Sequence, residues 1–257
     1  MQGRRSIHIM AVGMLVVFGA LVPALAPADS SRAVPFVFIG TAAQCGGVAG
    51  SHIVTSAWLG GMGLPDNGGP NGDPATANDP HRGVLLNKNG PTTDCSSAGL
   101  IITNVPKVIT DLDFDYRNGT HCGAGAPRFN IETKAGFTYF AGCANGVHTP
   151  ATQDPLQWTH VTFSAAGGLV SPQFPDNPPF VFGVTEVKRL SIVYDEGTDT
   201  PGTEDPNGVG LSNIDNISVN TAVISSGSGI ADGTQGNRSR NGDGSDDNKD
   251  NNGHGDD

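Results

Sequence analysis

The sequence predicts an all-β fold, a two-sheet antiparallel β-sandwich, from three observations. Short runs alternate between apolar and polar residues, as strands do when one face is buried and the other is wet. Glycine occurs 37 times and proline 18 times in 257 residues, so turns are frequent. Only four of the 25 acidic residues are glutamate, and no long segment has a helical period.

Ten segments carry the strand pattern, with turn residues between them. The alternation is clearest over 112–116, where leucine, phenylalanine and tyrosine point to one face and aspartates to the other. One buried face in each strand is what a two-layer antiparallel fold requires. The predicted strands are 34–39, 53–58, 84–86, 99–102, 112–116, 128–133, 137–140, 158–163, 190–194 and 214–219.

The chain divides into three parts. Residues 1–28 have a basic start at Arg4 and Arg5, an apolar run too short to span a membrane, and small residues before Ala28, the pattern of a cleaved signal peptide. We therefore expect a secreted, extracellular protein, made by bacterial export. Residues 29–224 form the β-sandwich domain. Residues 225–257, rich in Gly, Ser, Asn and Asp, predict a disordered acidic tail.

The net charge of −11 argues against nucleic acid and anionic membrane surfaces as partners, since both attract clustered Lys and Arg. The four cysteines of an exported chain predict two disulfides. We favour Cys122–Cys143, which closes a hairpin-sized loop, and Cys45–Cys95. A zinc site is the alternative, but no two cysteines have the spacing of a metal loop. The oligomeric state is left open.

Two long loops, 60–82 and 197–210, interrupt the strands, and an acidic stretch precedes the second. Calcium takes six to eight oxygen ligands from flexible loops, which these acids could supply. Asp215 interrupts the apolar pattern between its neighbours Ile214 and Ile217, which suggests a placed side chain. The alternative is an acidic turn with aspartates bonded to backbone amides. The candidate ligands of a structural Ca²⁺ are Asp195, Glu196, Asp199 and Asp215.

The polar faces of 112–116 and 128–133 suggest a ligand site if these strands are neighbours. Carboxylates, amides and guanidinium groups suit sugar hydroxyls, with an aromatic ring beneath. The alternative is a solvated, salt-bridged outer face. The candidate contacts are Asp113, Arg117, Arg128 and Trp158.

Asp113 and Asp115 also allow a catalytic interpretation. Residues two apart on a strand lie roughly 6.7 Å apart on one face, near the lower edge of the separation in inverting glycosidases. The run Asp111-Leu-Asp113-Phe-Asp115 resembles the acid-x-acid-x-acid strand of jelly-roll glycoside hydrolases of the laminarinase kind. Those enzymes use glutamate at the two catalytic positions, whereas this chain has aspartate throughout.

Two further segments resemble strands of galactose-binding-like jelly-roll carbohydrate-binding modules. They are Trp158-Thr-His-Val-Thr-Phe163 and Ile214-Asp-Asn-Ile-Ser-Val219. The resemblance implies a jelly-roll sandwich, and an aspartate near the last strand that helps to hold structural calcium. Other segments, 123–130 and 195–199, resemble uncharacterised secreted bacterial proteins, which implies no particular activity.

We therefore expect a secreted, non-catalytic binding module for extracellular carbohydrate, with Ca²⁺ as its candidate structural cofactor. One alternative is a glycoside hydrolase using Asp113 and Asp115. The other is a structural protein of the cell surface or matrix.

Overall fold

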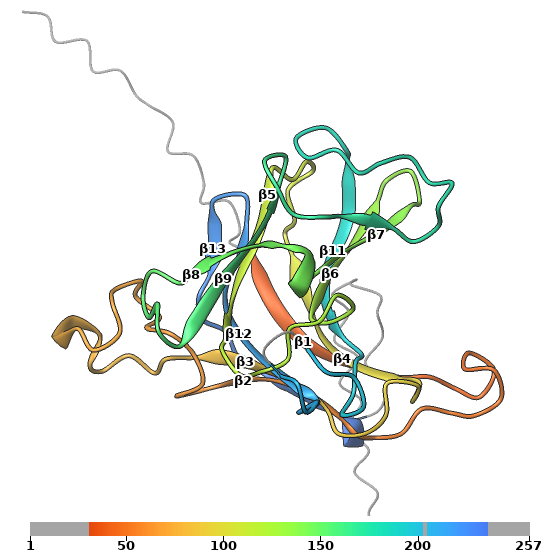
Figure 1. The fold of residues 1–257 in the computed structure, drawn as a ribbon, viewed down its shortest axis with the longest axis horizontal. Helices are drawn as coiled ribbons and strands as arrows, with labels where there is room; N and C mark the ends of the chain where they lie inside the picture. The colour runs from red at the N-terminus through yellow and green to blue at the C-terminus, as the bar shows by residue number, and fades with distance from the viewer. Residues whose placement is uncertain (1–30, 203–204, 236–257) are drawn as a thin grey trace, which may run out of the picture.

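The computed structural model describes residues 31–202 and 205–235, which form two antiparallel sheets packed face to face (Figure 1). The predicted all-β sandwich is confirmed. The predicted signal peptide and residues 236–257 of the predicted tail lie outside the described residues. Within the described ranges, no helix is long and apolar enough to cross a membrane.

Sheet A has six strands and sheet B has eight. The order in sheet A is β1 (Arg32–Ile39), β4 (Ser96–Thr103), β11 (Val187–Tyr194), β6 (Arg128–Thr133), β7 (Thr138–Gly142) and β10 (Ser171–Pro172). The order in sheet B is β14 (Ile230–Asp232), β2 (Val54–Leu59), β3 (Gly83–Lys88), β12 (Leu211–Val219), β5 (Asp111–Arg117), β9 (Trp158–Ser164) and β8 (Val147–Pro150), with β13 (Ala222–Ile224) paired to β12.

Every predicted strand overlaps an observed one, and the sequence pattern missed four short strands, β8, β10, β13 and β14. Three short 3-10 turns, η1 (Pro74–Thr76), η2 (Cys143–Asn145) and η3 (Gly233–Gln235), complete the elements. Strand β14 lies in the stretch assigned to the tail, so the ordered region extends past the predicted boundary at residue 224. Strand β14 is held mainly by backbone pairing to β2 rather than by burial of apolar side chains, because Ala231 is its one buried residue.

The core is made by the inner faces of both sheets. Phe114 of β5 and Phe163 of β9 each contact Phe129 of β6, with ring centroids 5.6 and 6.2 Å apart. All three rings are fully buried. Strands β5 and β6 therefore meet through their apolar faces, across the sandwich, and their polar faces point in opposite directions.

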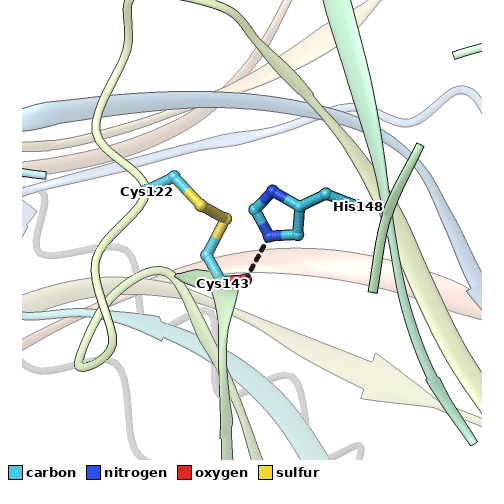
Figure 2. A group of neighbouring side chains, drawn as sticks. All are labelled: Cys122, Cys143 and His148. Carbon is cyan, nitrogen blue, oxygen red and sulfur yellow. Dashed lines mark hydrogen bonds between the residues drawn. A yellow bond between two sulfur atoms is a disulfide. The ribbon is translucent and has the colours of Figure 1, made fainter. Parts of the chain in front are cut away.

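Both predicted disulfides are present. Cys45–Cys95 ties the turn after β1 to the start of β4, and Cys122–Cys143 ties the segment after β5 to η2. Figure 2 shows His148 of β8 beside the second disulfide, where its Nε2 lies 2.8 Å from the carbonyl oxygen of Cys143.

A buried lysine joins three segments at one end of the sandwich. Lys88, at the end of β3, is fully buried, and its ammonium donates to the carbonyl oxygens of Thr92, Asp94 and Asp195 at 3.0, 2.6 and 2.9 Å. Burial lowers the pKa of Lys88, while the nearby carboxylates oppose that shift. Three hydrogen bonds match the three donors of an ammonium group.

Replacing Lys88 with methionine should lower the free energy of unfolding by about 2–4 kcal/mol, because three carbonyl oxygens lose their donor in a buried place. Urea unfolding of Lys88→Met beside Lys188→Met, an exposed lysine of β11, measures the effect. Equal midpoints for the two variants would contradict it.

Candidate functional site

A groove lies on the outer face of sheet B, over β5, β9 and β12. Its volume is about 320 Å³, at the lower end of the range for small-ligand sites. The edge strand β8 and the turn after it form one wall, and β13 lies at the other side. The lining residues are Gly68, Asp113, Asp115, Thr149, Pro150, Thr152, Gln153, His160, Asn216, Ser218 and Val223.

The sheet register places three titratable side chains in one row beneath this groove. Asp215 of β12 pairs with Asp115 of β5, and Asp115 pairs with His160 of β9. Directly opposite residues of neighbouring strands project on the same face. Asp113, two residues from Asp115 on β5, extends the row along the strand.

His160 lies between two carboxylates. Its Nδ1 is 2.7 Å from Oδ1 of Asp115, and its Nε2 is 3.5 Å from Oδ1 of Asp113. These contacts, with Asp113 and then with Asp115, raise the pKa of His160 to about 9, against the opposing effect of burial. The ring is therefore an imidazolium at neutral pH.

A β-bulge brings Asn216 onto the same face. Residues Asp215 and Ser218 of β12 pair with Asp115 and Asp113, so β12 has one more residue than β5 between these pairs. Asn216 has a φ of 45°, a left-handed conformation that asparagine tolerates better than most residues. Its Nδ2 donates to Oδ2 of Asp115 at 2.7 Å and to Oε1 of Gln153 at 2.5 Å.

Asp215 anchors the long loop 60–82 to the sheet. Its Oδ2 accepts from the backbone N–H of Leu64 at 2.6 Å, and its Oδ1 accepts from that of Asn216 at 2.7 Å. Burial raises the pKa of Asp215 to about 8, although the two N–H donors act in the opposite direction. Leu64 then packs with Trp158 and Ala151 in a small second core outside the sandwich.

The predicted ligand contacts are brought together only in part. Asp113, Arg117 and Trp158 share the outer face of sheet B, where Arg117 pairs with Trp158. Trp158 is 2 % exposed, so its ring is covered by the loop and offers no platform to a ligand. Arg117 is exposed and donates to Gln157 outside the groove lining.

The predicted patch that joined β5 to β6 does not form. Arg128 lies on β6 in sheet A, where its guanidinium makes a two-pronged ion pair with Asp195, at 2.5 and 2.7 Å, and lies over the ring of Phe140. The condition for that patch, that the two strands are neighbours, is not met, because β5 and β6 lie in different sheets and contact each other through the core.

The four predicted calcium ligands have separate partners. Asp195 binds Arg128, Glu196 lies 2.7 Å from Nε2 of His121, and Asp199 accepts from the backbone N–H of Thr92 at 2.6 Å. Asp215 lies apart from these three, under loop 60–82. Calcium binding by this set stays a prediction, and the arrangement matches the alternative of aspartates bonded to their surroundings.

In the part of the chain that the structure describes, one group of ligand-type side chains gathers closely enough to hold a metal ion. It consists of Cys122, Cys143 and His148 (Figure 2). Both sulfurs form the disulfide, and metal ligation by cysteine requires a thiolate. The group is therefore a disulfide with a neighbouring histidine.

Sequence reasoning did not identify His160, Asn216 and Gln153 as site residues. His160 lies on a strand among apolar residues, and its carboxylate partners are about 45 residues earlier in the chain. A signal for the bulge was present, because Ile214 and Ile217 are both fully buried although they are three residues apart. Strict alternation would have pointed one of them outward.

Comparison with protein-family models, with curated proteins and with solved structures found no match to this chain. The site is therefore interpreted from its own geometry.

We expect the free energy of unfolding to fall as pH rises from 6.5 to about 9. Between these two pH values His160 is protonated in the folded state and deprotonated in the unfolded state. The stability that the bound proton contributes is fully present below pH 6.5, and it is lost as pH rises through the folded-state pKa of about 9. The loss should be on the order of 1–2 kcal/mol, since the side chain is 36 % exposed.

Urea unfolding of the wild type and of His160→Gln at both pH values measures this loss. The raised pKa of Asp215 also makes the free energy of unfolding fall as pH rises, between pH 3.8 and about 8. The contribution of His160 is therefore the difference between the pH dependences of the two proteins. An NMR titration of the His160 ring gives its midpoint directly. The same pH dependence in both proteins, with a midpoint near 6.5, would exclude the proposed imidazolium.

Proposed function

We propose that this chain is an exported, non-catalytic binding protein that takes an extracellular carbohydrate in the groove of sheet B. The observation that carries the proposal is a groove of about 320 Å³ whose lining includes the side-chain oxygens of Asp113, Asp115 and Ser218 on the paired strands β5 and β12. Sugar hydroxyls donate to carboxylate and hydroxyl oxygens of this kind. The two disulfides are consistent with export, since disulfides persist in oxidising compartments.

The groove is held in place before any ligand arrives. Asp115 is fixed by His160 and Asn216, and Gln153 is fixed by its donation to the carbonyl oxygens of Pro65 and Gly69 at 2.9 and 3.0 Å. A site whose side chains are already ordered loses less entropy on binding. Asp113 is 9 % exposed and contributes the most accessible carboxylate of the lining.

The same contacts favour binding over hydrolysis. A glycosidase needs one protonated carboxyl group as acid beside one ionised carboxylate. Asp113 and Asp115 both contact the ring of His160, so the two carboxyl groups share one environment and neither is set apart as the acid. Asp215 has a raised pKa, but it is fully buried and both its oxygens accept backbone N–H groups, so it has no route to a substrate.

Depletion of the protein from solution by insoluble polysaccharides, with calcium and with a chelator, tests the proposal. Asp113→Asn should weaken binding by about tenfold or more, because it removes a charge-assisted hydrogen bond. Asp111→Asn is the matched control, since it removes the same charge from the same face of β5 outside the groove.

Each alternative gives a different result. Release of soluble sugar that Asp113→Asn abolishes would indicate the glycoside hydrolase using Asp113 and Asp115. Neither depletion nor release, with self-association or retention at the cell surface, would indicate the structural role. A loss of depletion on chelation would support the predicted calcium.

A further inference from the structure

The side-chain N–H groups that line the groove are all engaged within the protein. Both hydrogens of Asn216 Nδ2 are used by Asp115 and Gln153, and both of Gln153 Nε2 by Pro65 and Gly69. The two ring nitrogens of His160 face Asp115 and Asp113. A ligand group that only accepts hydrogen bonds therefore finds no free side-chain N–H in this lining.

Acceptors remain open in the same lining. Asp113 contacts His160 through Oδ1, which leaves Oδ2 for a ligand. Ser218 donates its hydroxyl hydrogen to the carbonyl oxygen of Asn220 at 3.1 Å and keeps its lone pairs free. Ser218 pairs with Asp113 across β12 and β5, so these two acceptors are adjacent.

The charge in the groove is also negative. Asp113 and Asp115 contribute two carboxylates and His160 one positive charge, and no lysine or arginine is in the lining. A buried negative site attracts cations and disfavours anions. The remaining side-chain donors of the lining are the hydroxyls of Thr149 and Thr152, at its exposed rim, so the negative charge beside Asp113 is what favours a cationic ligand.

We infer that the groove selects a ligand with a primary ammonium group, so that the carbohydrate of the proposed function, on which this inference rests, is an amino sugar with free amines. An ammonium has three donors and no acceptor, which complements the open oxygens of Asp113 and Ser218. The protein satisfies such a group elsewhere, since three carbonyl oxygens surround the ammonium of Lys88.

Calorimetric titration at pH 6 with two sugar hexamers tests this inference. One is the hexamer of glucosamine and the other its N-acetylated counterpart, which has the same backbone without the charge. Spermidine, an amine without a sugar, is the third probe. At this pH carboxylates are ionised, and most of the glucosamine amines are protonated although the neighbouring oxygens lower their pKa below that of a simple alkyl amine. The glucosamine hexamer should bind at least tenfold more tightly than the acetylated one.

The matched pair of variants separates the groove from general attraction to an acidic protein. Asp113→Asn should remove the preference for the free amine, and Asp111→Asn should keep it, although both variants lose one negative charge. Equal weakening by both substitutions would overturn the inference, because attraction by net charge alone would then explain the binding. Circular dichroism of both variants verifies that they fold.

The remaining outcomes distinguish this inference from the proposed function. Equal affinity for the two hexamers, lost in Asp113→Asn, would overturn the ammonium preference and support carbohydrate binding. Spermidine binding as tightly as the glucosamine hexamer, with the same dependence on Asp113, would support ammonium selection and overturn the sugar. No binding of any probe, together with no depletion by any polysaccharide, would overturn both.

Discussion

The outer face of sheet B is polar and yet mostly covered, and the need to satisfy its hydrogen bonds shapes the whole site. A buried carboxylate without hydrogen-bond partners is costly, and each of the buried carboxylates here accepts from a donor on another segment. Asp115 is held by His160 from β9 and Asn216 from β12, and Asp215 captures the backbone of loop 60–82. The need to satisfy buried carboxylates therefore explains both the position of loop 60–82 and the ordered lining of the groove beside it.

The long loops of this protein are fixed mainly by charged groups bonded to backbone or to opposite charges. The ammonium group of Lys88 donates to carbonyl oxygens of the β3–β4 connection and of the segment after β11. The acidic loop that follows β11 is fixed from several sides, by Arg128, His121 and Thr92. The acidic residues that suggest a cation site in the sequence thus each have a partner within the protein, which their content alone does not reveal.

The sequence allowed the strands and the disulfides to be predicted, since alternation and cysteine parity depend on local and covalent rules. It also indicated Asp113 and Asp115, whose side chains share a face by the two-residue period of a strand. The partners of that pair could not be predicted, because His160 and Asn216 reach it only through the order of strands in sheet B. The same missing information left open whether Arg128 joins that pair, and its strand proves to face β5 across the core.

The bulge in β12 has a consequence for how this strand tolerates change. With one extra residue at Asn216, Ile214 and Ile217 both reach the core while Asp215 and Ser218 both reach the groove face. The bulge therefore absorbs one extra residue without changing the side on which the residues before and after it lie. Deleting Asn216 would restore regular alternation, with Ile214 and Ile217 still in the core and Asp215 and Ser218 still on the outer face. The loss would fall on the hydrogen bonds of Asn216 to Asp115 and Gln153, so the extra residue serves the groove rather than the register of the strand.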